Sequence, residues 1–160
     1  MRLLLSSIVV LSLATPALAQ QRHNSEAPID FGADHIELQD KANRAILTGN
    51  VSVKQAEMTL TSARMTVAYT GQVVDGSPQV SRLDAAGSVV VTRPDQTARS
   101  QYAIYDLNQR TILMMGDVTL TQGGNVTHSQ RLTLNLAEAQ PHATLGGGRV
   151  TGTFSVPKRN

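Results

Sequence analysis

The feature that most constrains this chain is an internal repeat of about 29 residues. Three segments share a Gly-polar-Val-x-apolar core, namely Gly49–Val53, Gly87–Val91 and Gly116–Leu120. A serine stands thirteen residues after each glycine, at Ser62, Ser100 and Ser129, and each serine opens a strand-like octet. Similarity at a fixed spacing is typical of one supersecondary unit used several times. The sequence therefore predicts a stack of equivalent units.

Each unit is predicted to be a pair of β-strands, because the apolar residues alternate with a period of two. The midpoints between successive serines and glycines predict the turns, which are expected at Lys41, Gln55–Ala56, Asp75–Gly76, Asn108 and 139–141. A glycine inside a strand usually marks a bulge or bend. Gly49, Gly87 and Gly116 are therefore predicted to bend successive antiparallel strands at one height, so that two half-sheets face each other.

The interior of this all-β fold is predicted to hold alternating apolar side chains. These are Val51, Val53, Met58, Leu60, Met65, Val67, Val89, Val91, Ile104, Ile112, Met114, Val118, Leu120, Leu132 and Leu134. Mirror pairing joins residues at equal distances from a predicted turn midpoint. It places Ile104 opposite Ile112 and Val51 opposite Leu60, whereas a shifted register is expected at Gly123-Gly124. Two interpretations of the interior remain open: the dry core of a sandwich, or a lipid groove favoured by adaptable methionines and few aromatic rings.

The N-terminus has the pattern of a signal peptide. Arg2 precedes an apolar run from Leu3 to Ala14, and Ala17-Leu18-Ala19 supplies a small-x-small cleavage site. The run is too short to span a bilayer, which needs about 20 apolar residues. We expect cleavage between Ala19 and Gln20 and export of the mature chain. The predicted organisation is a signal peptide (1–19), a flexible leader (20–30), one β domain (31–152) and a tail (153–160).

Catalysis and nucleic-acid binding are disfavoured by the residue patterns. A nucleophile needs a base, and among the three repeated serines only Ser129 has a neighbouring histidine, His128. The chain has no cysteine, and its four histidines share no metal-ligand spacing. The 146–149 loop lacks the Lys-Ser/Thr of a phosphate-binding loop. The chain has only five aromatic residues, and its net charge is +2 with the basic residues scattered along the sequence. Both features argue against a nucleic-acid-binding surface. We therefore expect no enzymatic activity, metal or cofactor.

The repeated cores resemble a known family signature. Thr48–Val53, with its later copies Ala86–Val91 and Met115–Leu120, resembles the T-G-N-V-x-[VL] signature of the OstA-like (LptA) family. Ala33–Leu38 resembles the A-D-x-[IMV]-x-[LV] strand of that family. Residues 92–97 and 121–125 resemble its hairpin tips, and the resemblance covers about residues 28–152.

This resemblance implies a β-jelly-roll of V-shaped antiparallel strands in the periplasm. It implies a bridge protein that carries lipopolysaccharide between the membranes and shields the lipid A acyl chains in its groove. The implied partners are the inner-membrane-anchored and outer-membrane OstA-like domains and further copies of the chain, added head to tail. The alternative is a structural β-repeat module, an envelope scaffold or adhesin with a dry core.

Overall fold

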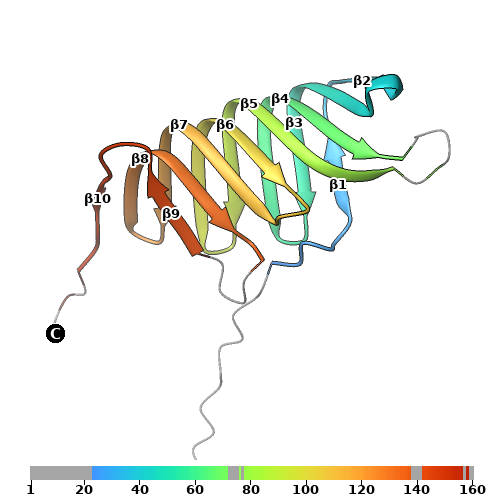
Figure 1. The fold of residues 1–160 in the computed structure, drawn as a ribbon. Helices are drawn as coiled ribbons and strands as arrows, with labels where there is room; N and C mark the ends of the chain where they lie inside the picture. The colour runs from blue at the N-terminus through green and yellow to red at the C-terminus, as the bar shows by residue number, and fades with distance from the viewer. Residues whose placement is uncertain (1–22, 72–75, 77, 138–141, 157, 159–160) are drawn as a thin grey trace, which may run out of the picture.

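The computed structural model describes residues 23–71, 76, 78–137, 142–156 and 158. In that part the chain forms one ten-stranded antiparallel sheet (Figure 1). Its strands are β1 (Ile29–Gly32), β2 (His35–Gln39), β3 (Arg44–Gln55), β4 (Met58–Thr70), β5 (Gln79–Arg93), β6 (Gln96–Asp106), β7 (Thr111–Gln122), β8 (Asn125–Asn135), β9 (His142–Gly146) and β10 (Thr151–Thr153). A single 3-10 turn, η1 (Asp40–Ala42), lies between β2 and β3. Among the described residues no helix is long and apolar enough to cross a membrane.

Strands β3 to β8 pair in chain order as a meander, which confirms the predicted all-β architecture. The turns expected at Lys41, Gln55–Ala56 and Asn108 are present, since Gln55 pairs with Met58 and Asp106 pairs with Thr111. The turn expected at 139–141 lies outside the described residues, and so does Asp75 of the turn expected at Asp75–Gly76. The expected cleavage site also lies outside them.

The register shift expected at Gly123-Gly124 is confirmed, because mirror pairing would place Val118 opposite Thr127, whereas Val118 pairs with Ser129. Gln122 pairs directly with Asn125, and the two glycines form the two-residue turn of a tight hairpin. Glycine suits such a turn because it adopts positive φ readily, and Gly123 has φ +55°. A bulge between β7 and β8 lies beside Gly116, between the pairs that Met115 and Val118 make.

The repeated glycines form a row of β-bulges across the sheet. Gly49, Gly87 and Gly116 have φ of +79°, +83° and +83°. Each is followed by a second left-handed residue: Asn50, Ser88 or Asp117. The two residues face one residue on the partner strand, which is the arrangement of a bulge and bends the strand. The predicted bends at the three glycines are therefore confirmed.

The repeated serines complete the same bends from the neighbouring strands. The Oγ atoms of Ser62, Ser100 and Ser129 each donate to the carbonyl two residues further on, at 2.9, 2.8 and 3.0 Å. All three serines are buried. Their hydroxyls thus satisfy a backbone group where the ladder is interrupted, which accounts for their recurrence in structural terms.

The bulge row divides the sheet into two half-sheets. The first half-sheet consists of β2, β9 and residues 44–48, 64–70, 79–86, 102–106, 111–115 and 131–135. The second consists of β1, β10 and residues 51–55, 58–62, 89–93, 96–100, 118–122 and 125–129. The strands curve over along the upper side of Figure 1; the hairpin tips of the second half-sheet point downward, whereas the β6–β7 tip of the first half-sheet points to the lower right. We call the space between the two rows of tips the mouth.

The sheet begins earlier than the sequence indicated. β1 starts at Ile29, inside the segment expected to be a flexible leader, and pairs with the end of β3. Ile29 itself packs against the core. The edge strand of the sheet therefore includes Ile29 and Asp30, the last two residues of the segment 20–30.

Candidate lipid-binding interior

The two half-sheets enclose one continuous apolar interior. Of the fifteen side chains predicted to face it, fourteen are buried in a single cluster. Their exposed fractions reach at most 9%, at Val67, and are 0% at Met65, Ile112, Met114 and Leu132. The alternating pattern thus identified the inward-facing side of β3, β4, β5, β7 and β8 correctly.

Ile104 is the exception, and its predicted inward orientation was wrong. It is only partly buried and lies opposite Asp84 and Leu113, outside the core cluster. The reason is the bulge: Gln101 and Tyr102, which follow buried Ser100, are both exposed, so the inward parity of β6 shifts by one residue. The predicted pair of Ile104 with Ile112 is therefore also wrong, because Ile104 lies opposite Leu113.

The inward residues of β6 are Ala103 and Tyr105, each 1% exposed. The repeat itself contained the signal that identifies them. Inward residues stand three and five positions after the other two serines, as Met65 and Val67 do after Ser62. The same offsets from Ser100 give Ala103 and Tyr105. The two predicted mirror pairs are wrong: Ile112 lies opposite Tyr105 rather than Ile104, and Leu60 lies opposite Val53 rather than Val51.

Further inward residues precede each glycine by two and four positions. They are Leu47 and Ala45, Ala85 and Leu83, and the already predicted Met114 and Ile112. Each repeat therefore contributes equivalent side chains to the interior on both sides of the bulge row. The apolar surface consequently extends without interruption from β3 to β8.

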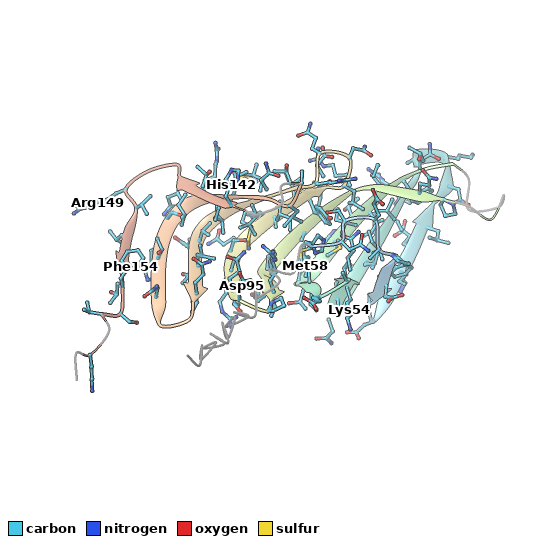
Figure 2. The ribbon with its side chains drawn as sticks, turned by 90° about the horizontal axis from the view of Figure 1, so that it is seen from below. Lys54, Met58, Asp95, His142, Arg149 and Phe154 are labelled. Carbon is cyan, nitrogen blue, oxygen red and sulfur yellow. The ribbon has the colours of Figure 1, made fainter. Side chains whose placement is uncertain are left out.

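The interior is closed in this conformation. The 0% exposure of its central side chains means that no water-sized space adjoins them. Figure 2 views the molecule from below: Met58 and Asp95 lie along one side of the mouth and His142 along the other. A ligand placed among these side chains would therefore require the two half-sheets to move apart.

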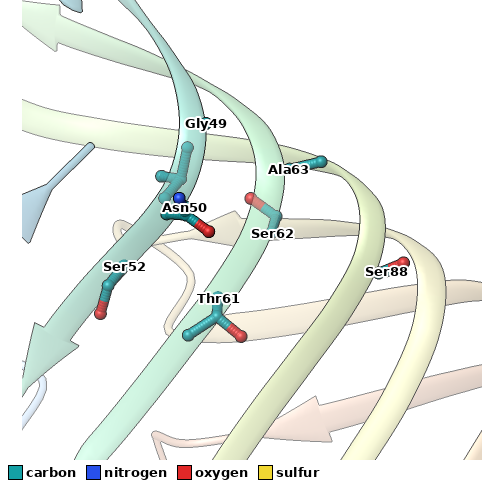
Figure 3. A pocket seen from close by; sticks show the side chains of 8 residues that line it. Gly49, Asn50, Ser52, Thr61, Ser62, Ala63 and Ser88 are labelled. Atoms are coloured by element: carbon teal, nitrogen blue, oxygen red, sulfur yellow. The ribbon is translucent and has the colours of Figure 1, made fainter. Parts of the chain in front are cut away.

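A shallow hollow of about 540 Å³ lies at the bulge row (Figure 3). Asn50, Ala63 and Ser88 line its exposed part, and Ser62 forms part of its buried wall. None of its eight lining residues has an ionisable side chain. Within the described part of the chain, no three His, Cys, Asp or Glu side chains are grouped so that they could hold a metal ion.

Both ends of the sheet expose apolar side chains on or beside edge strands. At one end these are Phe31 on β1 and Leu38 on β2, with exposed fractions of 59% and 57%. At the other end Phe154, just after β10, is 68% exposed and Val150 is 43% exposed. Edge strands carry unpaired backbone groups and can accept a further strand.

Comparison with known proteins identifies the family. Residues 31–140 match the family described as "LptA/(LptD N-terminal domain) LPS transport protein". This match covers more than half of the chain. The chain belongs to the LptA/LptD N-terminal domain family. It is also 31% identical, over 150 residues, to an uncharacterised protein of Rhizobium meliloti strain 1021, covering 86% of this chain and 81% of the relative.

A solved structure has the same fold. It is described as LptH, the LptA-homologous periplasmic component of the lipopolysaccharide transport device of Pseudomonas aeruginosa. The TM-score is 0.68 at 20% sequence identity, with 82% of this chain and 98% of LptH covered. This match and the all-β sheet confirm the LptA-like jelly-roll that the sequence resemblance implied.

Proposed function

We propose that this member of the LptA/LptD N-terminal domain family is a periplasmic bridge protein that carries lipopolysaccharide from the inner to the outer membrane. The observation that supports this proposal most directly is the uninterrupted apolar interior. Every repeat supplies equivalent side chains to it, so a lipid tail meets the same surface at each step along the sheet. A surface of this kind suits cargo that moves through the protein without being changed.

The physical requirement is shielding of the lipid A acyl chains from water. Each exposed CH₂ group costs about 0.8 kcal/mol, so a chain of a dozen carbons cannot cross an aqueous compartment unprotected. The half-sheets provide that protection when the acyl chains lie between them. Met58, Met65 and Met114 are distributed among the interior side chains, and methionine adapts its shape to irregular neighbours.

The proposed partners are other domains of the same kind. The exposed apolar side chains beside β1 and β10 support addition of a strand at either end. We propose that one end meets an inner-membrane-anchored domain, that the other meets an outer-membrane domain, and that copies of this chain can join head to tail. Directionality then comes from a partner, because the described residues present no group that drives transport.

The closed interior also favours a second candidate, a structural envelope module with a dry core. Lipid analysis of the purified protein distinguishes the two. The chain would be exported, isolated under mild lysis, and extracted with organic solvent for mass spectrometry. Co-purified lipid A species support the bridge protein, whereas an extract free of lipid A from a folded protein supports the dry-core module.

A further inference from the structure

The N-terminal segment 23–28 crosses the mouth of the V. In Figure 1 the described start of the chain runs along the lower side of the sheet before it turns up into β1. Its backbone and side chains contact both half-sheets: Gln55 at a tip of the second and Arg110 at a tip of the first. The segment is therefore placed where the two half-sheets would have to part.

Gln55 is the centre of these contacts and is only 2% exposed. Its Nε2 donates to the carbonyls of Ser25 and Ala27, at 2.9 and 3.1 Å. Its Oε1 accepts from the Tyr105 hydroxyl at 2.7 Å and lies 3.2 Å from Nε2 of His23. One buried amide thus joins the N-terminal segment, the second half-sheet and, through Tyr105, the first half-sheet.

A second contact ties the segment to the opposite row of tips. Glu26 Oε1 lies 3.0 Å from a guanidinium nitrogen of Arg110, and the two side chains are 81% and 43% exposed. Exposed ion pairs contribute little to stability. Buried, fully hydrogen-bonded amides are far more costly to disrupt. The principal fastening is therefore Gln55, and the ion pair only assists it.

We propose that segment 23–28 is a strap that holds the mouth closed between the tips of β3 and β6, and that lipid enters the interior faster when this strap is released. The gating part rests on the proposed lipopolysaccharide function. The fastening part does not, because it concerns only the distance between the two rows of tips.

The fastening is tested by measuring that distance. The chain contains no cysteine, so Glu57→Cys and Gln109→Cys place two spin labels at defined positions, one on each row of tips. Pulsed electron resonance would compare this labelled chain with the same chain carrying Gln55→Leu, which removes the hydrogen bonds but conserves side-chain size. Hydrogen exchange at residues 23–28 provides a second readout.

Gln96→Leu is the matched control. Gln96 is also a buried glutamine at a tip of the second half-sheet, but it accepts a 3.0 Å bond from Gln122 of the same half-sheet. We expect Gln55→Leu to broaden and lengthen the distance distribution and to speed exchange in the strap, whereas Gln96→Leu changes neither. If Gln55→Leu fails to fold, Tyr105→Phe removes only the bond to the first half-sheet. An unchanged distribution, or equal broadening by the control, overturns the strap.

The gating is tested with fluorescently labelled lipopolysaccharide. We expect Gln55→Leu to capture it several-fold faster than the unsubstituted chain and than Gln96→Leu. Equal capture rates in a variant whose mouth has opened would overturn the gate. If the mouth opens but neither chain captures lipopolysaccharide, the proposed function fails and the fastening stands.

Discussion

The hydroxyl of Tyr105 donates a 2.7 Å hydrogen bond to Oε1 of Gln55, and this bond spans the two half-sheets. Tyr105 stands on β6 of the first half-sheet, and Gln55 ends β3 in the second. Both side chains are almost fully buried. Burial raises the pKa of Tyr105 above its ordinary value. The relationship makes the closure of the interior testable at single side chains.

Tyr105→Phe should lower the free energy of unfolding by about 1 kcal/mol, the typical net contribution of a hydrogen bond. Urea unfolding of the two chains measures this difference. The control is Tyr102→Phe, because Tyr102 is 54% exposed on the outer face of the same strand. The control should leave stability unchanged within about 0.5 kcal/mol. Equal losses in both variants would argue against the cross-sheet bond.

Gly87→Val should destabilise the fold by about 1–3 kcal/mol, because a β-branched residue is strained at positive φ. The backbone of Gly87 has φ +83°, and an added Cβ would lie 3.0 Å from Cβ of Ala63. Gly32→Val is the control: nothing lies within 4 Å of its added Cβ, and its φ is outside the strained range. Thermal unfolding compares them, and a Gly87→Val chain as stable as the control would refute the bend argument.

Val91→Glu should unfold or severely destabilise the protein, because the side chain is 1% exposed among apolar neighbours. An unpaired buried charge costs several kcal/mol, on the order of 3–5. Val90→Glu, one residue earlier, places the same charge on the outer face and should be tolerated. Circular dichroism during chemical unfolding measures both. A folded Val91→Glu chain of normal stability would mean that Val91 faces water.

Acidification should weaken the strap through His23. Burial is the largest cause that lowers the pKa of His23 below its ordinary 6.5, and the positive charge of Arg93 lowers it further. The hydrogen bond with Gln55 and the negative charge of Glu57 act in the opposite direction. As the pH falls, His23 is therefore protonated in the unfolded chain before it is protonated in the folded chain. The contribution of neutral His23 to stability is lost as the pH falls below about 6.5, and the loss levels off below the lowered folded-state pKa.

The measurement is the free energy of unfolding between pH 7.5 and 5.5, in the unsubstituted chain and in His23→Gln. Glutamine keeps a donor at this position but does not titrate. The variant should show a shallower decline of stability with falling pH. Identical pH profiles would exclude His23 as a contributor to the strap.

The sequence predicted the bends at Gly49, Gly87 and Gly116 because a repeated glycine in a strand has few other causes. It predicted most interior residues because a buried face alternates with period two. Ile104 was misplaced because the bulge beside Ser100 shifts the parity of β6, and a two-residue period alone does not record such a shift.

The strap could not be predicted in the same way. Residues 23–28 form no strand, and short polar segments of this kind carry no periodic signal. Their position depends on Gln55, which appears in the sequence as an ordinary turn residue and becomes buried only when Tyr105 reaches it from a strand fifty residues away. Long-range hydrogen bonds of this type are visible only in the folded chain.

The most direct test of the account is a comparison of photo-crosslinking at the two faces of the sheet in cells. A photoreactive amino acid would be placed at inward-facing Val53, Val91 and Leu120 and, separately, at their outward-facing neighbours Ser52, Val90 and Thr119. Successive side chains of a strand point to opposite faces. A lipid-carrying interior should give crosslinks to lipopolysaccharide at the three inward positions and none at the three outward positions. Crosslinks to protein alone at the inward positions, or equal lipid labelling on both faces, would contradict it.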